Sequence, residues 1–315
     1  MSAPPLIYIA GVSPRSGTNY LSRLVSKHPS CVAIADGEDH FLSKSDLLRL
    51  FAERVYGHWS VDWSLKKKNT SKDVLGAIGE GLLKFLRSQA ITENGQTAEE
   101  NTSTVVTKTP HPKNVGLFDR LFHDSFLILL IRDGRAVTES RMRTFEESFD
   151  EAVQAWRRGA REVIRFVEEH GWTSDWHRVL KYETVFKDPE EELRQIYDDV
   201  GMNFSSYPSS YLEEIAVVGS STYGEDGEGV TWEEKQDDGS FNPLNRFQDW
   251  EKEKHERFEW LAGEEFRNLG YTTSQPITSA SVARHYLLDV KQFPKNAKRA
   301  VHAKLRSLVF SHVTE

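Results

Sequence analysis

The sequence predicts an α/β protein of three layers, in which a central parallel sheet is flanked by helices on both faces. Three observations lead to this prediction. Leu6–Gly11 and Phe126–Ile131 are short apolar runs of the kind that form buried parallel strands. Each run is followed by a turn and then by a segment with helical spacing. Strand and helix patterns alternate over most of the chain, as they do in βαβ units.

The other elements continue this alternation. Further strands are expected at residues 32–35, 104–107 and 179–182. Residues 43–93 have a mostly helical pattern, interrupted by a surface loop at 61–70. Four more segments have the apolar spacing or end signals of helices, namely residues 19–27, 114–122, 150–169 and 189–200.

The composition excludes several classes of protein. The 315 residues, 38% of them hydrophobic, are enough for a substantial core. A net charge of −8 argues against a general nucleic-acid binder, which needs a basic face. Cys31 is the one cysteine, so a disulfide framework and a cysteine-based zinc site are excluded. No apolar run has the length of a membrane span or a signal peptide, and a cytoplasmic protein is expected.

Charge also divides the chain. Residues 212–265 hold 16 acidic and 5 basic residues, whereas the chain from residue 276 onward holds 7 basic and 2 acidic ones. We therefore expect one domain over residues 1–275 and a basic helical extension over 276–315. The pattern favours solvated amphipathic helices that pack on the domain. Three alternatives stay open for the extension: a cover for the site, a contact between subunits of a homo-oligomer, or a contact with an anionic membrane.

A loop between the first strand and the first helix has the features of an anion-binding site. Backbone N–H groups of such a loop point at a ligand together with the helix N-terminus. Its candidate ligands are a guanidinium, two hydroxyls, a glycine that permits close approach and an amide: Arg15, Ser16, Gly17, Thr18 and Asn19. The alternative is an ordinary turn in which the hydroxyls satisfy helix amides.

This loop differs from the G-x-x-x-x-G-K-[ST] pattern of nucleotide-binding P-loops. Five residues separate Gly11 from Gly17, where the pattern has four, and Thr18 stands where that pattern has lysine. The charge comes from Arg15, two positions before the second glycine. A kinase that uses Mg-ATP is therefore disfavoured, and it is kept as an alternative.

A second cationic site is predicted after the strand Phe126–Ile131. Arg132 follows this strand directly, at the edge where open α/β sheets bind ligands, and Ser140 lies two turns into the next helix. The alternative for Arg132 is a salt bridge to Asp133 or Glu139. Phe126–Asp133 could also imitate a Walker B strand, in which Asp133 would be a magnesium ligand.

Together the two sites resemble the sulfotransferase family, which uses 3′-phosphoadenosine 5′-phosphosulfate (PAPS) and has a P-loop-like fold. The order Pro14-Arg-Ser-Gly-Thr18, then Arg132-Asp-x-Arg-x-x-x-x-Ser140, carries the resemblance. Residues 180–189, Arg246-Phe-x-x-Trp250 and Phe266-x-x-Leu-Gly-Tyr271 resemble later parts of that family.

The resemblance implies a role for each site. The first loop would hold the 5′-phosphosulfate, and Arg132 with Ser140 would hold the 3′-phosphate. Tyr182 is implied to lie near the adenine, with a core aromatic as the alternative, and Ser221 is a further candidate contact. Trp250 is expected to belong to the core. The product would be adenosine 3′,5′-bisphosphate (PAP), and no metal is required.

The catalytic base is expected on the loop after the second strand. Glu38-x-His40-Phe resembles a segment of the heparan sulfate O-sulfotransferases whose glutamate is the base, and His40 would orient the base or the acceptor. A hydrated acidic loop is the alternative. Lys108 would stabilise the transferring sulfonate together with Arg15, a residue shared with the protein-tyrosine sulfotransferases. The alternative for Lys108 is an ordinary surface lysine at the end of a strand. His111 is a second candidate base, because Lys108-Thr-Pro-His111 partly matches the segment that carries the histidine base in cytosolic sulfotransferases.

The expected activity is an in-line sulfuryl transfer from PAPS to a hydroxyl or amine acceptor. The acceptor class is a small molecule, a carbohydrate or a protein side chain, and the acidic loops favour a neutral or basic one. A catalytically inactive nucleotide-binding interaction module is the alternative outside enzymes. A homo-oligomer is compatible with the sequence, and neither a nucleic-acid partner nor a transmembrane segment is expected.

Overall fold

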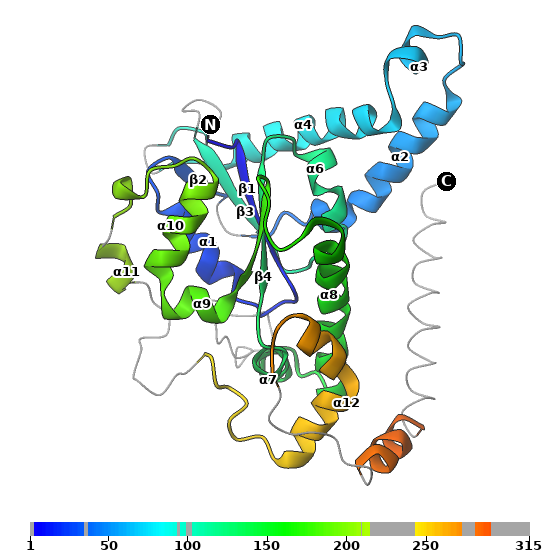
Figure 1. Ribbon diagram of the computed structural model, residues 1–315. Helices are drawn as coiled ribbons and strands as arrows, with labels where there is room; N and C mark the ends of the chain where they lie inside the picture. The colour runs from blue at the N-terminus through cyan, green and yellow to red at the C-terminus, as the bar shows by residue number, and fades with distance from the viewer. Residues whose placement is uncertain are drawn as a thin grey trace, which may run out of the picture.

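Among the residues that the structure describes, five parallel strands form the central sheet (Figure 1). A computed structural model describes residues 3–34, 37–92, 95–98, 103–208, 210–214, 243–272 and 281–290. The order of the strands across the sheet is β2-β3-β1-β4-β5, and all four pairings are parallel. All five carboxyl ends therefore meet at one edge. In chain order the strands are β1 (Leu6–Gly11), β2 (Cys31–Ala33), β3 (Thr104–Thr109), β4 (Phe126–Ile131) and β5 (His177–Lys181).

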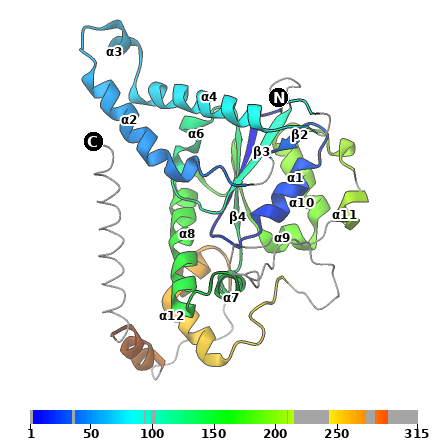
Figure 2. The same ribbon diagram turned by 180° about the vertical axis from the view of Figure 1, so that it is seen from behind.

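Helices cover both faces of this sheet, which confirms the three-layer fold (Figures 1 and 2). Short 3-10 helices are η1 (Leu42–Lys44), η2 (Val115–Leu117) and η3 (Phe204–Ser206). The α-helices are α1 (Thr18–Ser26), α2 (Ser45–His58), α3 (Ser64–Lys68), α4 (Ser71–Gln89), α6 (Phe118–Leu121), α7 (Gly134–Phe145), α8 (Phe149–His170), α9 (Tyr182–Lys187), α10 (Pro189–Asp199), α11 (Ser210–Glu214) and α12 (Lys252–Asn268). No helix within the described ranges is both long and apolar enough to cross a bilayer.

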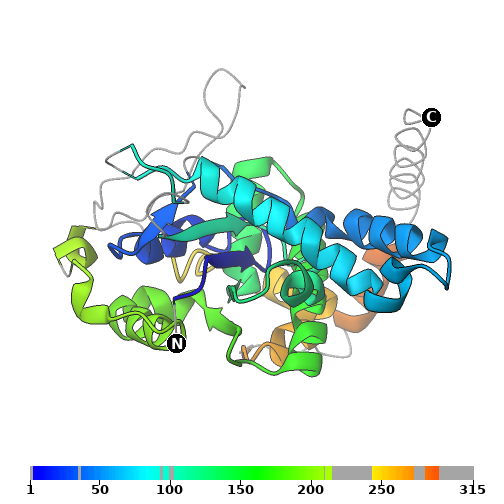
Figure 3. The ribbon, with the colours of Figure 1, turned by 90° about the horizontal axis from the view of Figure 1, so that it is seen from above.

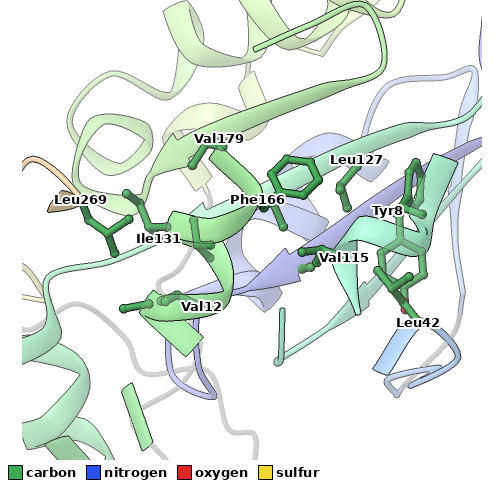
Figure 4. Packing of buried hydrophobic residues seen from close by; sticks show 14 of the residues in the cluster. Tyr8, Val12, Leu42, Val115, Leu127, Ile131, Phe166, Val179 and Leu269 are labelled. Carbon is green, nitrogen blue, oxygen red and sulfur yellow. The ribbon is translucent and has the colours of Figure 1, made fainter. Parts of the chain in front are cut away.

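Each strand buries alternate side chains in two separate cores. Along β1, Tyr8 and Ala10 face the core beneath α4, α6, α8 and α12, whereas Ile7 and Ile9 face the core beneath α1, α9 and α10. Figure 4 shows part of the first core, where Tyr8 lies near Leu42. Burial on both faces is the reason that β1 and β4 are apolar throughout.

Outside residues 43–93, the predicted strand and helix ends lie within two residues of the observed ones, and two local assignments differ. β1 and β4 begin and end where the sequence indicates. Tyr182, predicted to end a strand, is instead the first residue of α9. The predicted surface loop at 61–70 contains the five-residue helix α3, because a helix this short leaves no long periodic signal.

Helices α2 and α4 form an arm that extends away from the sheet, with α3 at its far end (Figures 1 and 3). The base of the arm is tied to the body. Asp46, in the first turn of α2, accepts hydrogen bonds from Lys113 Nζ at 3.3 Å and from Asn114 Nδ2 at 3.1 Å. The arm therefore begins next to the loops that follow β2 and β3.

The predicted extension is described only at residues 281–290, which are helical and pack on α12. Arg257 on α12 forms an ion pair with Asp289 at 2.7 Å, and Trp260 Nε1 donates to the same carboxylate at 2.8 Å. The division at residue 275 stays a prediction.

Candidate active site

The loops after all five strands bring the predicted site residues to one edge of the sheet. Glu38 follows β2, Lys108 lies near the end of β3, and Arg15 follows β1. Arg132 follows β4 directly, and Tyr182 follows β5. Residues from distant parts of the sequence thus meet at the edge where parallel sheets bind ligands.

Ser16 holds the loop after β1 in shape. Its buried hydroxyl donates to the carbonyl oxygen of Ser13 at 2.6 Å and accepts from the Ser13 N–H at 3.1 Å. Arg15 has a φ of +80°, a strained conformation for a residue with a Cβ. These contacts give Ser16 a structural role in the loop. The loop leads directly into α1.

The N-terminus of α1 lies at the end of this loop. Its first helical residue is Thr18, and within the described part of the chain no side chain caps the helix. The Oδ1 atom of Asn19 is buried and has no hydrogen-bond partner among the described residues. Uncapped amides and a helix dipole favour an anion at this position.

Position 17 requires glycine for two reasons: its backbone has a positive φ, and there is no room for a Cβ. Its φ is +94°, and a Cβ built on it would lie 2.3 Å from Cδ2 of Tyr182. The Tyr182 ring is buried directly behind the loop, and its predicted contact with adenine stays a prediction. Any side chain at position 17 would displace the ring or the loop.

Three arginines converge near Ser140. Arg15 Nε donates to the Ser140 hydroxyl oxygen at 3.0 Å, and Arg246 Nη1 donates to the same oxygen at 3.1 Å. The Arg132 guanidinium lies 4.2 Å from the centre of the Tyr182 ring, in a cation–π contact. We call Arg15, Arg132, Arg246 and Ser140 the arginine cluster.

The arginine cluster is an environment that disfavours positive charge. Burial, and then the charges of Arg132 and Arg141, lower the pKa of Arg15 to about 10. Burial, and then Arg132 and Arg15, lower the pKa of Arg246 to about 9. Cations held together in this way favour a bound anion, which would offset both effects.

Arg132 does not form the salt bridges that the sequence left open. Asp133 pairs instead with Arg135 at 2.6 Å, and Glu139 pairs with Arg143 at 2.7 Å. The hydrogen bonds of Arg132 go to backbone carbonyl oxygens, one of them that of Arg15 at 2.9 Å. Its Nε is buried and has no partner within the described ranges. Arg132 is therefore held in place without being neutralised.

Arg246 belongs to the arginine cluster, and the sequence reasoning assigned it no role. Trp250 is buried, as expected, and its Nε1 donates to Glu139 Oε2 at 2.8 Å. Since Glu139 adjoins Ser140, this contact brings the segment from 246 to 250 onto α7 beside the cluster. The motif Arg246-Phe-x-x-Trp250 was the sequence signal that could have identified Arg246 as a candidate. Ser221 lies outside the described residues.

Asp39 fastens the loop after β2 to the sheet. Its Oδ1 accepts from the Tyr8 hydroxyl at 2.6 Å and from the Phe41 N–H at 2.8 Å, while Oδ2 accepts from the Thr107 hydroxyl at 2.6 Å. Tyr8 belongs to β1 and Thr107 to β3. The neighbouring Glu38 is therefore attached to a rigid support, which the sequence reasoning did not foresee.

Glu38, His40 and Lys108 lie together on this support. Glu38 Oε2 is 3.5 Å from His40 Nε2, and Lys108 Nζ donates to the Gly37 carbonyl oxygen at 2.8 Å. Burial raises the pKa of Glu38, and the charge of Lys108 opposes this shift. The arrangement can accept a proton at Glu38 beside a cation.

His111 lies near the same group. Burial, and then the charges of Arg141, His40 and Lys44, lower its pKa. A neutral imidazole can also accept a proton, so the two bases considered from the sequence are both present at this edge.

A family model described as the sulfotransferase family matches residues 5–206, which is more than half of the chain. The chain belongs to the sulfotransferase family. This match covers β1 to β5 and the loops that carry Arg15, Glu38, Lys108 and Arg132. The resemblance seen in the sequence is confirmed at the level of the family.

Solved sulfotransferase structures are similar to this sulfotransferase along most of their length. The sulfotransferase domain from the curacin biosynthetic pathway is 19% identical, with 92% of this chain and 99% of that chain covered and a TM-score of 0.44. The domain from the Synechococcus PCC 7002 olefin synthase is 16% identical, with 91% and 96% covered and a TM-score of 0.45. Mouse SULT7A1, crystallised with PAP, is 12% identical, with 84% and 85% covered and a TM-score of 0.44.

Proposed function

We propose that this sulfotransferase transfers the sulfuryl group of PAPS to a hydroxyl of a neutral or basic acceptor. The observation that carries the proposal is the arginine cluster, which adjoins the uncapped N-terminus of α1. A donor with phosphate groups at both ends needs two anion sites on one edge. The loop at 15–19 supplies one site, and the cluster supplies the other.

The residues of the cluster fit a phosphate group. Arg132 Nε is buried without a partner among the described residues, so it has a donor to offer. The Ser140 oxygen accepts from two guanidiniums, which leaves its own O–H as a donor. We assign Arg132, Arg246 and Ser140 to the 3′-phosphate.

The loop after β1 is assigned to the 5′-phosphosulfate. The amides of Gly17, Thr18 and Asn19 lie at the start of α1, where a phosphate is stabilised by the helix dipole. Arg15 belongs to this loop through its backbone and to the cluster through its bond with Ser140. It therefore joins the two anion sites.

Glu38 is proposed as the base that takes the acceptor's proton. A carboxylate with a raised pKa is a stronger base than an exposed one, provided that it is ionised. Lys108 favours the ionised form and supplies positive charge beside it. His40, at 3.5 Å, is placed to orient the carboxylate or the acceptor.

PAPS, when bound, supplies the sulfuryl group and a phosphate leaving group. The chain's own contribution is to fix the donor, to hold positive charge at Lys108 and Arg15, and to remove the acceptor proton at Glu38. Charge stabilisation by groups already in place is an effective source of rate enhancement. The proposal needs no metal.

Ligand-dependent melting tests the proposal. PAP should raise the melting temperature with or without magnesium, and adenosine 5′-monophosphate should raise it less. Transfer of labelled sulfate from PAPS to a panel of hydroxyl compounds then measures activity directly. Stabilisation by Mg-ATP but not by PAP would support a kinase instead, and PAP binding without transfer to any acceptor class would support an inactive binding module.

A further inference from the structure

The far end of the arm carries exposed apolar side chains. We call residues 59–72 the arm tip; they comprise the connection from α2 to α4, which contains α3, and the first two residues of α4. Val61, Trp63 and Leu65 are 72%, 54% and 52% exposed. All three lie within five positions of the chain, at the end farthest from the sheet (Figures 1 and 2). Exposed apolar groups gathered in one place mark an interaction surface.

The same tip is positively charged on an acidic protein. Residues 59–72 contain four lysines and one aspartate, whereas the whole chain has a net charge of −8. Lys66 is fixed to the arm, because its Nζ donates to the Tyr56 carbonyl oxygen at 2.7 Å and lies 3.4 Å from the centre of the Tyr56 ring. Lys67 and Lys68 are exposed beside it.

We propose that the arm tip docks on an anionic phospholipid membrane. An indole ring lies favourably among lipid headgroups, with its apolar body inward and its N–H in the polar layer. The aliphatic part of a lysine side chain can lie beside apolar groups in this layer while its ammonium group stays at the lipid phosphates. Trp63 beside Lys67 and Lys68 combines both features, and charge complementarity selects an anionic surface over a neutral one.

The arm would hold the active edge at a fixed distance from the membrane. α2 has 14 residues, which corresponds to about 20 Å of helix. Its first turn is bonded through Asp46 to Lys113 and Asn114, close behind Lys108 in the chain. This inference is independent of the proposed reaction, because it concerns only where the body is held.

Vesicle sedimentation tests the docking. The full chain should sediment with vesicles of phosphatidylcholine and phosphatidylserine, and much less with phosphatidylcholine alone. The double variant Lys67→Glu/Lys68→Glu should lower the partition coefficient by at least about tenfold, and Trp63→Ser should also lower it. Trp172→Ser changes a 41% exposed tryptophan outside the arm and should bind like the wild type. Equal melting temperatures would show that the variants fold.

A fluorescent probe identifies the part of the molecule that touches lipid. Cys31 is buried, and burial raises the pKa of its thiol to about 12, so a label can be directed to a new cysteine. An environment-sensitive dye on Val61→Cys should shift to the blue with anionic vesicles, and one on Trp172→Cys should not.

Three outcomes would overturn the proposal. One is a wild-type chain that stays in solution with anionic vesicles. Another is sedimentation without a response at position 61. The third is self-association in analytical ultracentrifugation that the tip variants abolish, which would assign the tip to a second copy of the chain.

Discussion

Arg132 donates from Nη1 to the backbone carbonyl oxygen of Arg15 at 2.9 Å. The two residues are distant in sequence, yet this bond joins the loop after β1 to the end of β4. Side chains predicted to bind opposite ends of one donor therefore belong to a connected site. A substitution of Arg132 should therefore also alter the position of the loop that carries Arg15.

Replacement of Arg132 should weaken binding of the 3′-phosphate selectively. Arg132→Met removes charged donors that contribute about 1.5–3 kcal/mol, so PAP affinity should fall by about 10- to 100-fold. The affinity for adenosine 5′-monophosphate should change far less. Isothermal titration of both nucleotides measures the ratio. Arg165→Met, an exposed arginine on α8, is the matched control. Equal losses for the two nucleotides would contradict the assignment.

Glu38→Gln should abolish turnover while PAP binding remains. Loss of a general base costs about 10²- to 10⁴-fold in rate, and the amide keeps the size of the side chain. His111→Gln should stay within a few-fold of the wild-type rate. Single-turnover transfer from labelled PAPS gives both rates. The reverse pattern would make His111 the base.

The pH dependence of kcat/KM should report the pKa of Glu38. Activity requires the ionised carboxylate, so it falls as the pH drops through this pKa, and burial places the acidic limb above that of an ordinary glutamate. Lys108 lowers the pKa of Glu38. Lys108→Met should therefore move the limb to higher pH, in addition to slowing turnover, and Lys108→Arg should leave its position nearly unchanged. If the acidic limb stays at the same pH in Lys108→Met, then the charge of Lys108 does not act on the Glu38 carboxylate.

Gly17→Ala should damage the donor site. A positive φ costs an L-residue about 1–2 kcal/mol, and the added methyl would meet the Tyr182 ring. PAP should no longer raise the melting temperature. Gly57→Ala is the control, since nothing lies within 4 Å of its Cβ, and on α2 it should stabilise the protein by about 0.5–1 kcal/mol. A Gly17→Ala variant with normal PAP affinity would argue against a tight loop.

Asp39→Ala should destabilise the fold and slow turnover. It leaves the buried Tyr8 and Thr107 hydroxyls without their acceptor, at a cost of about 3 kcal/mol. Asp39→Asn keeps one acceptor oxygen and should cost less. Urea unfolding measures the stability, and the rate at saturating substrate shows whether Glu38 is still positioned. No loss of stability in Asp39→Ala would contradict the anchoring role.

The sequence could predict the elements whose signals are local. β1 and β4 were placed correctly because strands buried on both faces must be apolar throughout. Arg15 and Arg132 were found because each follows such a strand. Arg246 and Asp39 were not assigned roles, since their partners lie 106 and 68 positions away at Ser140 and Thr107. Those contacts depend on strand order, which no local pattern specifies.

The arm is inserted between β2 and β3, whereas the arginine cluster is built from the loops after β1 and β4 and from the segment near residue 246. The whole insertion between β2 and β3 could therefore be replaced in evolution without changing the residues of the arginine cluster. Relatives that share the arginine cluster would then be free to differ in the surface on which they dock.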